Sequence, residues 1–96
     1  MDLQTFKASL DTDAPPADAS NALQALWYEN KGDWDRAHEL AQGEPDPIGA
    51  WVHAYLHRVE GDESNAGYWY KRACQPHSKA ALPEEWDKIA KALLTV

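Results

Sequence analysis

A Gly-Asp pair occurs twice in the chain, at residues 32–33 and again 29 residues later at 61–62. Glycine readily takes the left-handed conformation that ends a helix, and aspartate is a preferred N-cap for the helix that follows. Each pair therefore predicts a tight turn between two helices. Because the unit recurs with a period between 20 and 50 residues, the chain is predicted to be a helical repeat.

Helical spacing of apolar side chains extends on both sides of these turns, and no segment shows the alternation of a half-buried strand. We expect an all-α fold in which residues 1–96 form a single helical-repeat domain with two antiparallel hairpins, over residues 19–43 and 46–75. Asp46-Pro47 is predicted to open the second hairpin, with the aspartate as N-cap. Residues 83–95 are expected to form a C-terminal capping helix, and residues 1–18 a short N-terminal helix or arm and a linker.

The repeat resembles those of the tetratricopeptide and Sel1-like families. Residues 61–73 carry Gly-Asp at the turn, alanine five residues after the glycine, aromatic residues, and a closing alanine; residues 32–37 match the same turn. The period is shorter than the ~34 residues of a tetratricopeptide repeat. In addition, Gln24 and His53 stand where the families have apolar residues. The resemblance implies a scaffold that binds a protein or peptide and has no catalysis of its own.

The same resemblance places the first helix of each hairpin on the concave side of the array. The partner-binding residues expected there are Trp51, Tyr55 and Arg58 in the second hairpin, with Leu26 and Glu29 in the first. Tyrosine, tryptophan and arginine are favoured anchors of interfaces. Two alternatives stay open. Trp51 and Tyr55 pack against the capping helix instead, or uncovered hairpin faces pair two copies of the chain in a homo-oligomer.

Charge narrows the classes of partner. The chain carries a net charge of −7, with three basic and ten acidic side chains in residues 1–48 and six of each in residues 49–96. Such a surface disfavours nucleic acid and anionic membranes and suits a basic partner. The sequence has no apolar run near the ~20 residues that cross a bilayer, no signal-peptide pattern and a single cysteine. These features predict a cytoplasmic protein.

Two groups of residues offer chemistry beyond binding. His53 and His57 lie at i and i+4 on one helix face, the spacing with which helical sites chelate zinc, and His38 or Glu60 are candidates for a third ligand. Cys74 with His77 offers a nucleophile and a base. Since both groups lack further catalytic partners in the sequence, we expect a protein that is not an enzyme and has no cofactor. The alternative is a metal-dependent enzyme that uses the histidine pair or a thiol-dependent enzyme that uses Cys74.

Overall fold

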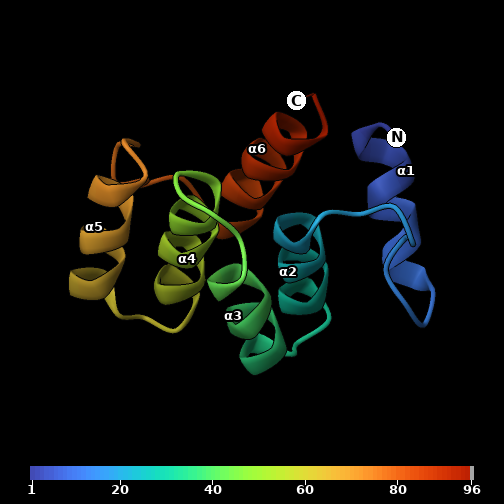
Figure 1. Ribbon diagram of the computed structural model, residues 1–96, viewed down its shortest axis with the longest axis horizontal. Coiled ribbons are helices and arrows are strands. Elements are labelled where there is room, and N and C mark those ends of the chain that lie inside the picture. Colours follow the sequence, from blue (N-terminus) through green and yellow to red (C-terminus); the bar gives the residue numbers. More distant parts are fainter. Residues whose placement is uncertain (96) are drawn as a thin grey trace.

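The computed structural model describes residues 1–95, and the regular structure within them is entirely helical. The all-α fold with two helical hairpins is confirmed: α2 pairs with α3, and α4 pairs with α5 (Figure 1). The elements are α1 (Leu3–Ala8), the short 3₁₀ helix η1 (Ser9–Asp11), α2 (Asn21–Asn30), α3 (Trp34–Gln42), α4 (Ile48–Val59), α5 (Glu63–Arg72) and α6 (Leu82–Leu94).

The turns inside the hairpins form as their sequences predict. Ser20, Asp33 and Asp62 each accept a hydrogen bond from the backbone N–H three residues further on, which caps α2, α3 and α5. Gly32 and Gly61 adopt φ values of 92° and 85°, where a side chain would be strained. Both Gly-Asp pairs therefore end one helix and begin the next.

The start of α4 corrects the sequence prediction. Pro47, which has no side-chain acceptor, stands at the N-cap, while Asp46 accepts hydrogen bonds from the Arg72 side chain of α5, the shorter at 2.6 Å. A Cβ added at Gly49 would collide with the carbonyl oxygen of Glu44. Close packing and an ion pair, rather than an aspartate cap, therefore hold the connection between the hairpins.

Small residues let successive helices approach closely. Ala25 of α2 and Ala37 of α3 are completely buried in the first hairpin, and Ala54 of α4 and Ala66 of α5 are completely buried in the second. The helices α2, α3, α4 and α5 pack in chain order, so that each contacts the next. They form an array in which α3 and α4 join the two hairpins.

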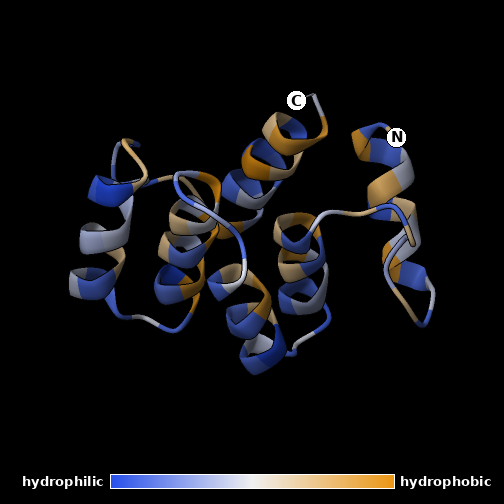
Figure 2. Ribbon diagram, in the orientation of Figure 1, coloured by the Kyte–Doolittle hydropathy of each residue, from blue (hydrophilic) through white to orange (hydrophobic). Residues whose placement is uncertain are grey.

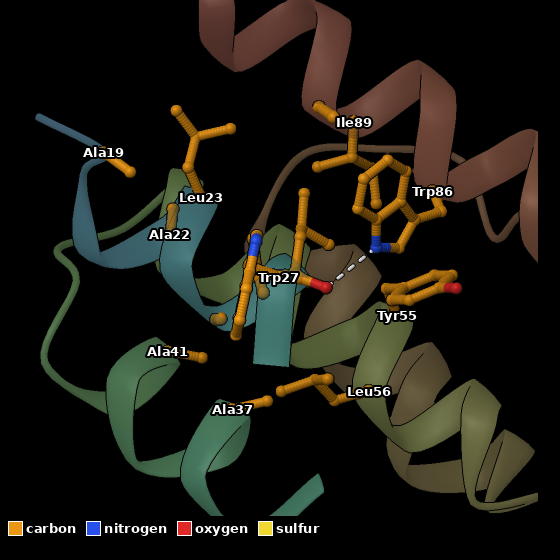
Figure 3. Packing of buried hydrophobic residues seen from close by; sticks show 14 of the residues in the cluster. Ala19, Ala22, Leu23, Trp27, Ala37, Ala41, Tyr55, Leu56, Trp86 and Ile89 are labelled. Atoms are coloured by element: carbon orange, nitrogen blue, oxygen red, sulfur yellow. Dashed lines mark hydrogen bonds between the residues drawn. The ribbon is translucent and has the colours of Figure 1, made fainter. Parts of the chain in front are cut away.

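The C-terminal helix α6 lies across α2 and α4, and α1 packs against α6 (Figure 1). Figure 3 shows Trp86 directed from α6 into the core, where its indole N–H donates to the carbonyl of Leu26 at 2.9 Å. On its other side the ring stacks on Phe6, with centroids 5.7 Å apart. Each terminal segment thus covers apolar surface that the hairpins alone would leave exposed.

Hydropathy differs between the helices of the array (Figure 2). Apolar residues concentrate on α2, α4 and α6, whereas α5 is hydrophilic or neutral along most of its length. None of the helices in residues 1–95 has the length and apolarity required to cross a membrane. The polar face of α5 borders the site described next.

Candidate functional site

The face on which a partner was expected lies inside the molecule. Leu26 is completely buried and Tyr55 is 2% exposed, because α6 covers α2 and α4 there. The hydroxyl of Tyr55 donates to the carbonyl of Leu82, at the start of α6, at 3.4 Å. Trp51 is partly buried and packs against the main apolar core and against a smaller cluster formed by Ala54, Ala66 and Tyr70. These three side chains therefore pack in the core, where Leu26 and Tyr55 expose almost no surface, and their contact with a partner stays a prediction.

Arg58 also has a structural role. Its side chain is 11% exposed and forms an ion pair with the buried Glu85 of α6 at 2.7 Å. The same guanidinium donates to the carbonyl of Ala80 at 2.7 Å, and Tyr70 donates to the second oxygen of Glu85 at 2.5 Å. A buried carboxylate with these donors is well satisfied, so the group joins α4 and α5 to α6.

Glu29 is the remaining residue of the expected partner face. It is half-buried beside Tyr55, and its Oε2 is the one buried side-chain oxygen or nitrogen in residues 1–95 without a hydrogen-bond partner. Burial raises the pKa of its carboxyl from 4.5 to about 7, because the charged form loses water. The carboxyl is therefore a source of pH-dependent stability.

Three histidines from two adjacent helices converge on the other side of α4. His38 of α3 lies against His53 and His57 of α4, and one ligand nitrogen from each ring lies within 4.8 Å of the other two. The Nε2 atoms of His53 and His38 are 2.7 Å apart. The predicted i, i+4 pair thus acquires its third imidazole from the neighbouring hairpin, and His53 and His57 are only 5% and 7% exposed.

Each imidazole of this cluster is held by a different contact. The His38 ring stacks on Trp34 at 4.8 Å between centroids, and the His53 ring stacks on Trp69 at 4.0 Å. The Nδ1 of His57 lies 2.6 Å from a carboxylate oxygen of Glu60, which leaves its Nε2 for another partner. The three rings are therefore oriented before any ligand arrives, as good metal sites require.

The surroundings favour the uncharged imidazole of His53 and of His38. Burial, together with repulsion from the neighbouring His38 and His57, lowers the pKa of His53 from 6.5 to about 4. Burial also lowers the pKa of His38, with repulsion from His57 as the next cause. The neutral imidazole has a lone pair to donate and is the form that binds metals.

The cluster lines an open hollow of about 620 Å³ between α3, α4 and α5. On the α5 side, the Arg72 guanidinium lies 4.5 Å from the centroid of the Trp69 ring and pairs with Asp46. The amide side chains of Gln42 and Asn65 and the carboxylate of Glu44 also line the hollow. The hollow is therefore large enough for a ligand beyond a single water molecule.

The sequence did not single out Trp34 and Trp69 as parts of this site. A signal for Trp34 was present, since Trp34 and His38 share the i, i+4 spacing at which helical side chains meet. For Trp69 and Arg72 there was none, because their place depends on how α5 packs on α4.

The remaining candidates are engaged elsewhere. Asp62, which groups with His57 and Glu60, already caps α5. His77 lies 2.6 Å from a carboxylate oxygen of Glu63 and stacks on Tyr70, and Cys74 is exposed rather than buried. The cysteine and histidine pair therefore gains no support as a nucleophile and base.

No family model, curated protein or solved structure matches this chain. The resemblance to tetratricopeptide and Sel1-like repeats stays a prediction, and the chemistry of the histidine cluster has to be inferred from its own geometry.

Proposed function

We propose that the protein binds a divalent transition metal ion of the zinc class through His38, His53 and His57. The observation that carries the proposal is the convergence of three ligand nitrogens, within 4.8 Å of one another, from two helices. Imidazole nitrogen suits zinc, copper, nickel and cobalt rather than magnesium or calcium, which prefer oxygen. The ligand type therefore supports the class of metal.

The distance between the ligand nitrogens of His38 and His53 needs only a small adjustment. Zinc–nitrogen bonds of about 2.0–2.1 Å in a tetrahedral arrangement place two ligand nitrogens roughly 3.3 Å apart. The 2.7 Å separation of the His38 and His53 nitrogens is that of a hydrogen bond, so one proton lies between them. With a metal ion between the two Nε2 atoms, the donor imidazole would carry its proton on Nδ1 instead, and the two nitrogens would move apart by about half an ångström, a shift within the reach of side-chain rotation.

A carboxylate behind one ligand supports the same proposal. Glu60 accepts the Nδ1–H of His57, which fixes the tautomer with Nε2 free and makes that nitrogen a better donor to a metal. Such carboxylate–histidine pairs are usual behind zinc ligands. The stacking of Trp34 and Trp69 on the other two rings would limit the entropy lost on binding.

The test is calorimetric titration of zinc into the untagged protein. We expect one equivalent to bind with a micromolar or lower Kd, and His38→Gln, His53→Gln and His57→Gln each to weaken binding by about 10-fold or more. The fourth histidine of the chain, His77, lies outside the cluster and provides the control, so His77→Gln should bind as the native protein does. Absence of heat at micromolar protein, or equal loss in the control, would refute the site.

A protein-binding role is a second candidate, now on a different surface. Tyr68 of α5 is 56% exposed. The guanidinium of Arg72 lies over the ring of its neighbour Trp69 in a cation–π contact. These residue types are favoured at interfaces. If α5 contacts a partner, Tyr68→Ala should weaken the complex. Because Tyr55 and Leu26 are buried, substitutions there should affect the complex only by destabilising the fold.

A further inference from the structure

We infer that the metal ion keeps one coordination position open toward the hollow and takes a carboxylate there. This inference rests on the proposed metal site and adds the class of ligand. The ligand is defined by its chemistry, a single carboxylate group, whether it belongs to a small acid or to a peptide.

The position stays open because the protein offers three ligands. In the part of the chain that the structure describes, no fourth His, Cys, Asp or Glu joins the three histidines. Of the nearby carboxylates, Glu60 lies against His57 and Asp46 pairs with Arg72, while Glu44 lines the hollow but does not group with the three histidines. A tetrahedral zinc-class ion with three protein ligands retains a place for water or an exogenous ligand.

The open position faces the hollow because the three rings that bind the metal also line that space. Trp34 lies against the His38 ring, and α4 itself carries the other two rings, so these groups occupy the remaining sides. A volume of about 620 Å³ admits several non-hydrogen atoms, since one water takes about 30 Å³ of liquid volume. Access is therefore not limited to hydroxide or water.

Charge selects a carboxylate. Three neutral imidazoles leave both positive charges of the ion uncompensated, because no anionic side chain belongs to the ligand set. Around the hollow, Arg72 and Asp46 compensate each other as an ion pair, and Glu44 carries one negative charge. Glu60, behind His57, carries a second negative charge. An anion on the metal would still neutralise charge within the coordination shell itself, and a singly charged carboxylate is repelled less by Glu44 and Glu60 than a doubly charged phosphate is.

The hollow also offers groups for the second carboxylate oxygen. Asn65 and Gln42 line it with amide side chains that donate hydrogen bonds, and Arg72 engages Asp46 through Nε and Nη2 and a single oxygen of that carboxylate. Asn65 lies on the same helix as Trp69, which holds the His53 ring. A ligand on the metal would therefore contact α5 as well as α3 and α4.

The test uses cobalt(II), whose visible absorption reports its coordination. Loading the protein with cobalt tests the metal site alone: intense tetrahedral bands are expected, and their absence overturns both proposals. Acetate is then added, followed in separate samples by a short peptide with a free C-terminus and the same peptide as its C-terminal amide. We expect acetate and the free peptide to shift the bands saturably, and the amide to leave them unchanged.

The relative affinities of acetate and the peptide distinguish a small acid from a peptide as the natural source. Cobalt bands that no carboxylate shifts, or that the amide shifts equally, overturn the carboxylate inference while leaving the metal site in place. A cobalt-dependent dimer in sedimentation, with the position filled by a second copy, also overturns it.

Variants on α5 and in the connection before α4 test the role of charge. Asn65→Ala and Arg72→Gln are expected to weaken acetate binding about 3- to 10-fold with cobalt affinity within 2-fold of native, as expected for lost hydrogen bonds and charge near the ligand. Asp46→Asn should strengthen acetate binding, because it removes a negative charge and frees Arg72. The exposed Lys71 beside Arg72 gives the control, since Lys71→Gln should change neither affinity. Equal effects of Lys71→Gln and Arg72→Gln would contradict a ligand in the hollow.

Discussion

At the scale of single residues, Glu29 shows how burial creates pH-dependent stability. Its carboxyl has a pKa raised from 4.5 to about 7 by burial, so the folded protein holds a proton that the unfolded chain releases above pH 4.5. Stability from this group is therefore greatest below pH 4.5, falls between pH 4.5 and 7, and stays constant above 7. The metal cluster lies on the other side of α4 and does not enter this argument.

We predict that Glu29→Gln raises the free energy of unfolding at pH 8 by about 1–2 kcal/mol, with little change at pH 4. The full pKa difference at about 1.4 kcal/mol per unit would give more, but the side chain is partly exposed and solvent reduces the effect. Urea unfolding at the two pH values measures the difference. The exposed Glu39→Gln is the control, and a Glu29→Gln effect independent of pH would contradict the assignment.

At the scale of helices and turns, the sequence predicts the hairpins because their signals are local. Gly32-Asp33 and Gly61-Asp62 carry the turn and cap in adjacent residues, and both form. The predicted N-cap of α4 at Asp46 does not form, because Asp46 instead accepts hydrogen bonds from Arg72, 26 positions away in the chain. His38 contacts His53 only because α3 packs on α4. The sequence could therefore name His38 as a candidate third ligand but could not predict that it joins the cluster.

A third helix end lacks the glycine of the other two. Cys74 adopts φ 57° after α5, and the N–H of Gln75 donates to the carbonyl of Tyr70, just as Asp33 donates to Tyr28 after α2. We predict that Cys74→Gly stabilises the protein by about 0.5–1 kcal/mol, because glycine avoids the left-handed penalty that other residues incur. Chemical denaturation measures it. Cys74→Ala keeps the left-handed backbone penalty, so its stability should be close to that of the native protein. A lower stability of Cys74→Gly would contradict the prediction and show that the exposed thiol stabilises the fold in another way.

At the scale of the whole molecule, α6 and the histidine cluster join the hairpins on opposite sides of α4. α6 lies across α2 and α4 and fills the face that the repeat pattern predicted to be open for a partner. Sequence could predict the apolar stripe of α6 but not which groove it enters, since that depends on Trp86 reaching the Leu26 carbonyl. The consequence is that the accessible polar site lies on the α3, α4 and α5 side.

A metal at this cluster would connect the first hairpin, through His38, to the second, through His53 and His57. An ion that binds only the folded state at 100 times its Kd stabilises that state by about 2.7 kcal/mol. For a domain of this size, each kcal/mol raises Tm by roughly 4–8 °C, so we predict that excess zinc raises Tm by roughly 10–20 °C. Scanning calorimetry with and without zinc measures the change in Tm.

The histidine variants give the controls. His77→Gln should show the same rise in Tm, whereas His38→Gln should lose most of the rise because the remaining pair lies on one helix and no longer joins the hairpins. A zinc-dependent rise that survives in His38→Gln would place the metal elsewhere.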